Sequence, residues 1–86
     1  MIKIYSIPEC PFCNELKEKL TNENVEFEDL NIFLDENTEE HTEVMEFTKS
    51  DEVPIVKINK YFLVPNVSFH SINECVETVK KLLAEE

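Results

Sequence analysis

Glycine is absent from the 86 residues of this chain, although it usually makes up about 7% of a protein. Its absence excludes the glycine-rich loops that hold phosphates in P-loop and dinucleotide-binding proteins, and leaves Asn, Asp, Ser and Pro to make the turns. Arginine is absent as well, and the 8 lysines are outnumbered by 19 acidic residues, which gives a net charge of −11. Such a chain repels nucleic acid phosphates and anionic lipids, so the composition disfavours nucleic acid and membrane partners.

Long apolar runs are missing too. No stretch approaches the roughly 18 consecutive apolar residues of a transmembrane helix. Residues 1–5 are too short and too alternating to form a signal peptide, which predicts a cytoplasmic protein. The length of 86 residues allows one small domain, covering residues 1–86, and the apolar share of 42% provides one modest core. We expect this domain to act as a monomer.

Apolar residues recur with two different periods along the chain. Alternation with a period of two predicts strands over residues 2–7, 25–32, 53–58 and 61–64. A helical period predicts helices over residues 11–22, from residue 37 to residue 49, and after residue 71. Asn59 and Lys60 form the turn between the last two strands. The resulting order, β-α-β-α-β-β-α, predicts an α/β fold with a parallel β-α-β start, an antiparallel hairpin, and helices on both faces of a four-stranded mixed sheet.

Two helix starts carry capping signals. Asn37 is followed three residues later by Glu40, and Ser71 is followed at the same spacing by Glu74, which predicts a capping box at each helix. The last helix also has an apolar stripe, formed by Ile72, Cys75, Val76, Val79, Leu82 and Leu83. The stripe predicts that its cysteine is a buried packing thiol.

The sequence Cys10-Pro11-Phe12-Cys13 stands where the first strand gives way to the first helix. Cys10 falls at the helix N-cap, and Pro11 falls at the first helical position, where a missing N–H costs nothing. The free N–H groups of Phe12 and Cys13 then point toward the Cys10 sulfur, and with the helix dipole they favour a thiolate there. A thiolate attacks disulfides, and Cys13 is placed to attack the resulting mixed disulfide and release the product. The pattern therefore predicts catalytic roles for Cys10 and Cys13 in thiol–disulfide exchange.

Two other interpretations of this cysteine pair are half of a zinc site and a chance pairing. A zinc site needs four ligands, and the remaining candidates, Cys75, His41 and His70, have no ligand spacing, so we predict no metal. His41 lies in an acidic helical turn and is expected to be solvated. His70 borders the last helix and is a candidate for contact with a ligand. Tyr5 and Phe12 are aromatic candidates for framing the cysteines.

The chain resembles the glutaredoxin family, which has the thioredoxin-like fold. The resemblance rests on the order of elements, on the motif at residues 10–13, which matches the family's C-P-[YF]-C, and on Val53-Pro54 at the head of the third strand, which matches its T-V-P. The resemblance spans nearly the whole chain. It implies that the Val53–Pro54 peptide bond is cis and lies beside Cys10, with the Val53 backbone directed at a bound peptide-like thiol. It also implies a set of substrate-binding residues, which are Pro11, Phe12, Val53, Pro54, Ser71 and Asn73.

One stretch departs from the family pattern. Family members usually carry Gly-Gly and then Asp near the start of the last helix, where the γ-glutamyl carboxylate of glutathione docks. This chain has residues 66–73 at that place, without any glycine. The helix N-terminus at Ser71 to Asn73 would still offer N–H groups to a carboxylate.

The resemblance implies a small dithiol–disulfide oxidoreductase that reduces disulfides in proteins or mixed disulfides with glutathione, with no bound cofactor. Glutathione or a thioredoxin-type reductase would be its electron donor, and ribonucleotide reduction is an example of a pathway that it would serve. The alternative is a non-enzymatic binding module on the same fold, such as an iron–sulfur carrier or a partner-docking subunit. Iron–sulfur assembly in this family commonly uses a single active cysteine, so the presence of Cys13 and Pro11 favours the enzyme.

Overall fold

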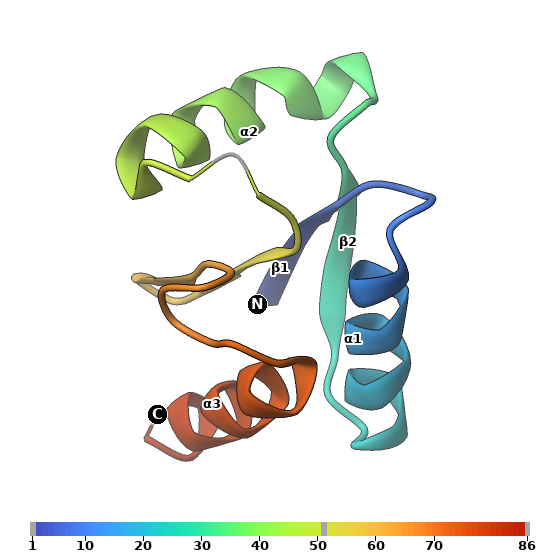
Figure 1. Cartoon of the computed structure of the whole chain (residues 1–86), viewed down its shortest axis with the longest axis vertical. Coiled ribbons are helices and arrows are strands. Elements are labelled where there is room, and N and C mark those ends of the chain that lie inside the picture. The colour runs from blue at the N-terminus through green and yellow to red at the C-terminus, as the bar shows by residue number, and fades with distance from the viewer. Residues whose placement is uncertain (1, 51, 86) are drawn as a thin grey trace.

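The computed structural model describes residues 2–50 and 52–85. The helices of this part of the chain are α1 (Pro11–Asn22), α2 (Asp35–Thr48) and α3 (Ile72–Ala84). The strands are β1 (Ile2–Ser6), β2 (Phe27–Asn31), β3 (Ile55–Ile58) and β4 (Tyr61–Leu63). Their order along the chain is the predicted β-α-β-α-β-β-α (Figure 1).

The strands form one mixed sheet in the order β2-β1-β3-β4. β1 runs parallel to β2, with Ile2 opposite Phe27, and antiparallel to β3, with Ile2 opposite Ile58. β3 and β4 are antiparallel because a short turn joins them, whereas the crossover through α1 makes the first pair parallel. β1 is therefore an inner strand, and its carboxyl end leads directly to the start of α1.

The two faces of the sheet carry separate apolar clusters. On one face, side chains of β1, β3 and β4 pack against α1 and α3, and this cluster includes Ile4, Leu16, Leu20, Val56, Ile58, Cys75 and Val79. On the other face, the cluster consists of Tyr5, Leu30, Val44, Ile55 and Val64. Neighbouring residues of a strand point to opposite faces, which places Ile4 and Tyr5 in different clusters. Figure 1 shows α2 on the far side of the strands from α1 and α3, so the prediction of helices on both faces is confirmed.

Asparagine takes the place of glycine in the turns. The residues with positive φ in the described part of the chain are Asn24, Lys49, Asn59 and Asn66. Asn adopts this region more readily than most residues because its short polar side chain bonds locally. Lys49 ends α2 in the same conformation, and its N–H donates to the Met45 carbonyl at 2.8 Å. The expectation that other residues make the turns is confirmed.

All four strands are shorter than predicted, and two of them, β2 and β3, also begin later. The N–H of Val25 donates to the Leu20 carbonyl at 2.9 Å, so this residue closes the end of α1 instead of starting β2. β3 begins at Ile55 rather than at Val53. Pro54 has no N–H to donate to a strand ladder, which accounts for the later start.

The predicted start of α2 is wrong. Leu34 occupies the N-cap without a side-chain capping bond, and Asn37 lies inside the first turn. The side-chain amide of Asn37 donates to the last carbonyl of β2 at 2.9 Å. The carboxylate of Glu40 accepts a hydrogen bond from the Tyr5 hydroxyl and pairs with Lys3 Nζ at 3.2 Å. Both polar side chains of the expected capping box are therefore engaged by the sheet.

The expectation that His41 is solvated is also wrong. Its side chain is only 9% exposed, because it lies one turn before Val44 on the side of α2 that faces the sheet. Burial lowers the pKa of the His41 imidazole. Its Nε2 atom has no hydrogen-bond partner within the described part of the chain. His41 is therefore a neutral residue of the interface between α2 and the sheet.

Candidate active site

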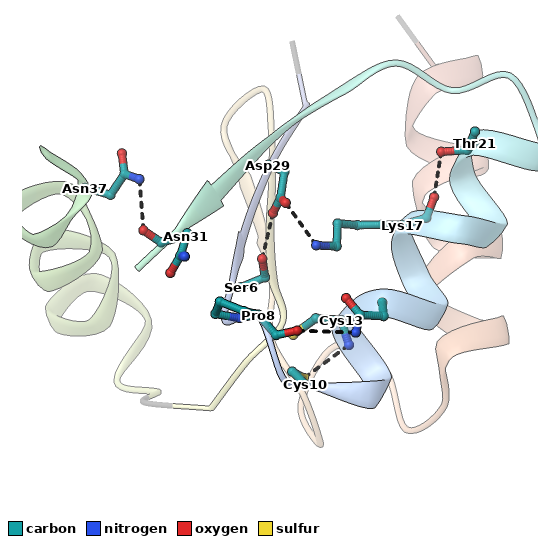
Figure 2. A network of polar contacts seen from close by, with 10 residues as sticks. Ser6, Pro8, Cys10, Cys13, Lys17, Thr21, Asp29, Asn31 and Asn37 are labelled. Atoms are coloured by element: carbon teal, nitrogen blue, oxygen red, sulfur yellow. Dashed lines mark hydrogen bonds and ion pairs between the residues drawn. The ribbon is translucent and has the colours of Figure 1, made fainter. Parts of the chain in front are cut away.

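The turn between β1 and α1 carries both cysteines of the motif. Cys10 is the N-cap of α1 and Pro11 is its first residue, as predicted. The Sγ atom of Cys10 accepts a hydrogen bond from the N–H of Cys13 at 3.1 Å (Figure 2). A sulfur in this position faces an N–H donor and the positive end of the helix dipole, and both interactions favour negative charge.

Hydrogen bonds hold this turn in shape on both sides of Cys10. The N–H of Cys10 donates to the Ile7 carbonyl at 3.4 Å, and the N–H of Asn14 donates to the Cys10 carbonyl at 3.0 Å. The side-chain amide of Asn14 donates to the Pro8 carbonyl at 3.4 Å. The end of β1 and the first turn of α1 are thus tied together, which fixes the position of the Cys10 sulfur.

The two cysteines differ in burial. Cys10 is 7% exposed, whereas Cys13 is 0% exposed. Burial raises the pKa of Cys13 to about 12, and the neighbouring Cys10 adds to the increase. A hydrogen bond with the Ile7 backbone and the positive charge of Lys17 act in the opposite direction. Cys13 is therefore a thiol at neutral pH, and Cys10 is the more exposed cysteine of the pair.

A polar network links α1 to the two parallel strands close to Cys13 (Figure 2). Lys17 lies one turn after Cys13, and its Nζ atom is 2.9 Å from the Asp29 carboxylate. The other oxygen of that carboxylate accepts a hydrogen bond of 2.6 Å from the hydroxyl of Ser6, the buried last residue of β1. The network holds one positive charge near Cys13. The sequence analysis did not identify it, although the i, i+4 spacing of Cys13 and Lys17 is the signal for a shared helix face.

A groove with a volume of about 330 Å³ opens beside the cysteine turn. It brings together four of the residues predicted to bind substrate, which are Phe12, Val53, Pro54 and Ser71. The Val53–Pro54 peptide bond is cis, as predicted. Glu15 of α1 and Ile72 of α3 also line the groove, and the segment between β4 and α3 completes the lining with Pro65, Asn66, Phe69 and His70.

The sequence analysis missed most of the segment between β4 and α3. Pro65 and Phe69 form an isolated β-bridge, and the N–H of Asn66 donates to the Phe69 carbonyl at 2.8 Å. This tight turn directs Phe69 inward, where it is 4% exposed. Apolar residues inside a segment of turn residues are the sequence signal that was available for this half of the groove.

Cys10 and Cys13 are not among the lining residues of the groove, and neither are three of the residues predicted to bind or frame the substrate. Asn73 lines a separate hollow with Lys19 and other residues at the end of α1. Neighbouring residues of a helix point about 100° apart, so Asn73 lies on a different side of α3 from Ile72, which lines the groove. Tyr5 is fully buried in the cluster beneath α2, so it does not frame the cysteines. Pro11 is exposed at the start of α1 and adjoins both Cys10 and Phe12 in the sequence.

The start of α3 confirms one half of its predicted capping box. The Ser71 hydroxyl accepts a hydrogen bond from the N–H of Glu74 at 3.2 Å. The carboxylate of Glu74 accepts from the N–H of His70 at 2.8 Å, one residue before the expected donor. A carboxylate of the chain itself therefore lies at the positive end of α3.

The remaining candidate groups do not gather into a second site. Cys75 is 0% exposed within the apolar cluster of α1 and α3, as predicted, and burial raises the pKa of its thiol to about 12. Across residues 2–50 and 52–85, no three His, Cys, Asp or Glu side chains are grouped so as to hold a metal ion. None of the helices in these ranges is both long and apolar enough to cross a bilayer.

Comparison with known proteins identifies the family. The family model of the glutaredoxins matches residues 2–63, from β1 to β4. The chain belongs to the glutaredoxin family. An uncharacterized glutaredoxin-like 8.6 kDa protein in the rubredoxin operon of Clostridium pasteurianum is 39% identical over 64 residues, which are 74% of this chain and 83% of that protein. The resemblance seen in the sequence is confirmed, and membership of this glutaredoxin family supports a thiol redox role.

Solved structures of glutaredoxins share the fold. Wheat glutaredoxin matches with a TM-score of 0.72 at 24% identity, over 96% of this chain and 76% of that one. The glutaredoxin-like NrdH-redoxin from Escherichia coli matches with a TM-score of 0.62 at 22% identity, over 84% of this chain and 90% of that one. That protein has a thioredoxin-like activity profile. The predicted thioredoxin-like fold of the glutaredoxin type is therefore confirmed.

Proposed function

We propose that this glutaredoxin is a dithiol–disulfide oxidoreductase in which Cys10 attacks the substrate and Cys13 resolves the intermediate. The observation that carries the proposal is the arrangement at the start of α1. The Cys10 sulfur lies at the N-cap, 3.1 Å from the N–H of Cys13, and the Cys13 side chain is 0% exposed. A substrate disulfide therefore reaches Cys10 first, at the sulfur with the better support for negative charge.

The reaction consists of two exchange steps. The Cys10 thiolate attacks one sulfur of the substrate disulfide, which forms a mixed disulfide and releases the other sulfur as a thiolate. Cys13 then loses its proton and attacks the Cys10 sulfur, which forms the Cys10–Cys13 disulfide and releases the second substrate thiolate. The protein is oxidised by two electrons, and the substrate disulfide is reduced by the same two electrons to two thiols.

The groove is assigned to the substrate. Phe12, Val53, Pro54 and Ser71 line it, and Pro11 adjoins it through Phe12. The paired register of β3 begins at Ile55, so the backbone of Val53 lies just beyond the ladder, where an extended peptide can lie against it. Disulfide-containing proteins are the expected substrates, and the protein works as a monomer in a reducing compartment such as the cytoplasm. Asn73 faces a different hollow and takes no part in this contact.

Two electron donors are consistent with this reaction. Glutathione reduces the oxidised pair through two further exchange steps, and a thioredoxin-type reductase does so through its own dithiol. The likeness to NrdH-redoxin, with its thioredoxin-like activity profile, supports the reductase as the donor.

The test supplies the purified protein with NADPH and either glutathione plus glutathione reductase or thioredoxin reductase alone. Hydroxyethyl disulfide and insulin serve as substrates, and consumption of NADPH is followed. The proposal predicts turnover with at least one donor and its loss in Cys10→Ser. No turnover with either donor, together with a brown iron–sulfur chromophore after anaerobic purification, would instead support the carrier.

A further inference from the structure

The groove beside the cysteine turn is largely apolar, and the exposed aromatic side chain of Phe12 forms part of its lining. Phe12 is 64% exposed, although it directly precedes the buried Cys13. The inner part of the groove is formed by Phe69 and Ile72, which are 4% and 6% exposed. An apolar side chain of a substrate would cover the Phe12 ring and remove its surface from water.

Carboxylates surround this apolar surface, and none of the residues that line it is a lysine. Glu15 is part of the lining. The carboxylate of Glu52 accepts a hydrogen bond from the Asn66 side chain at 3.3 Å, and that of Glu74 accepts from the His70 N–H at 2.8 Å. Asn66 and His70 both line the groove, so two further negative charges adjoin it.

The end of the groove at α3 already holds a carboxylate of the chain itself. A helix N-terminus normally attracts a carboxylate through its free N–H groups and its dipole. Here the N–H of Glu74 is bonded to the Ser71 hydroxyl, and the Glu74 carboxylate already lies at this end of α3. An incoming carboxylate would therefore meet a like charge at the place that would otherwise favour it.

We propose that the groove accepts a segment of a protein disulfide in which an apolar residue is flanked by lysine or arginine. This inference rests on the proposed function and names its substrate class. The apolar side chain packs between Phe12 and Phe69, and the cationic side chains lie near Glu15 and Glu74. The same carboxylates repel glutathione, which is an anion at neutral pH, so this segment is preferred over glutathione-like disulfides.

The test compares short cysteine peptides, each carried as a mixed disulfide with thionitrobenzoate, whose release reports the attack of Cys10. The first peptide has leucine and lysine beside the cysteine. The second peptide differs from it only in having glutamate in place of the lysine, and the third only in having serine in place of the leucine. We expect the lysine–leucine peptide to exceed the glutamate peptide in kcat/KM by about three- to tenfold at low salt. The difference shrinks at about 1 M salt, where charges are screened within roughly 3 Å. The serine peptide is expected to be slower than the leucine peptide at both salt concentrations.

Matched variants locate the effect. Glu15→Gln lowers the preference for lysine about twofold, whereas Glu18→Gln, which removes the same charge from an exposed position of α1 outside the lining, leaves it unchanged. Reduction of uncharged hydroxyethyl disulfide is measured alongside. Equal rates for the lysine and glutamate peptides, in protein that reduces hydroxyethyl disulfide, would overturn the substrate class and leave the oxidoreductase standing. Loss of all disulfide reduction would overturn the proposed function and this inference with it.

Discussion

Cys13 should react with iodoacetamide far more slowly than an ordinary thiol at neutral pH, because burial raises its pKa from 9.0 to about 12. At pH 7 this difference lowers the thiolate fraction about a thousandfold. The more basic thiolate is also a better nucleophile. With a Brønsted coefficient of about 0.4–0.5, the increase of about three pKa units makes the Cys13 thiolate roughly 16- to 32-fold more reactive, which offsets part of the loss. The expected net slowing is therefore about 30- to 60-fold, and the 0% exposure of the side chain adds to it.

Changing the pH provides the perturbation that tests this reasoning. The alkylation rate of Cys13 should rise about tenfold for each pH unit and continue to rise above about pH 10. A Cys75→Ala background leaves only the two motif cysteines, and free glutathione serves as the reference thiol. Short pulses of iodoacetamide, followed by digestion and fragment mass spectrometry, separate the rate at Cys13 from the rate at Cys10, which should be alkylated first.

Two results would refute the reasoning about Cys13. One is a rate at neutral pH close to that of the reference thiol, since it would mean that burial does not hold the proton on the sulfur. The other is a plateau below about pH 9, which would place the pKa near that of a free cysteine. Either result would also remove the chemical distinction on which the order of attack is based.

Three further predictions concern the surroundings of the site. Cys75→Ala should leave disulfide reduction within about twofold and lower the free energy of unfolding by about 1 kcal/mol, so a large loss of activity in folded protein would reveal a redox role. Tyr5→Phe should cost about 0.5–1.5 kcal/mol at neutral pH in urea unfolding, because the Tyr5 hydroxyl lowers the pKa of Glu40. That stabilisation is present above the unfolded-state pKa of Glu40, about 4.3, and is lost as the pH falls through the lower folded-state value, so a cost that does not decline as the pH falls below about 4.3 would contradict it. Lys17→Met should raise the pKa of Cys13 further, because it removes a nearby positive charge, and should slow release of the second product in single turnovers several-fold. Lys17→Arg should restore the rate. An unchanged rate in Lys17→Met would show that this charge does not assist the attack of Cys13.

Local chemistry made several elements of the fold predictable from the sequence. The N-cap position of Cys10 follows from the change of period at residues 7–11 together with Pro11, which suits only the first turn of a helix. The apolar stripe of α3 likewise predicted the burial of Cys75, because a helical period specifies which face is covered. Asn59 at the hairpin was predictable because a chain without glycine has few residues that accept a positive φ.

Contacts between distant segments account for what could not be predicted. The start of α2 was misplaced because the side chain of Glu40 bonds to Tyr5 and Lys3 of β1, and nothing near Glu40 in the sequence signals those partners. His41 was expected in solvent because its neighbours are acidic. Its position relative to Val44 decides its burial, and that becomes clear only when α2 lies on the sheet.

The candidate site was predictable in the same uneven way. The cysteine motif and Val53-Pro54 could be identified from short patterns, and the structure places Phe12, Val53 and Pro54 around one groove. The contribution of Phe69 depends on a turn of the backbone between β4 and α3, and apolar residues among turn residues do not by themselves specify that Phe69 points inward. Asn73 was grouped with the start of α3 by resemblance, although its helix position directs it elsewhere.

Trapping the intermediate tests the central claim most directly. Cys13→Ser removes the resolving thiol, so reaction with a peptide disulfide should stop at a stable mixed disulfide between Cys10 and the peptide, and mass spectrometry should locate it. Cys10→Ser should form no comparable adduct, because the remaining Cys13 is buried and protonated. An adduct on Cys13 in Cys10→Ser, formed as fast as the adduct on Cys10 in Cys13→Ser, would contradict the assignment of Cys10 as the attacking cysteine.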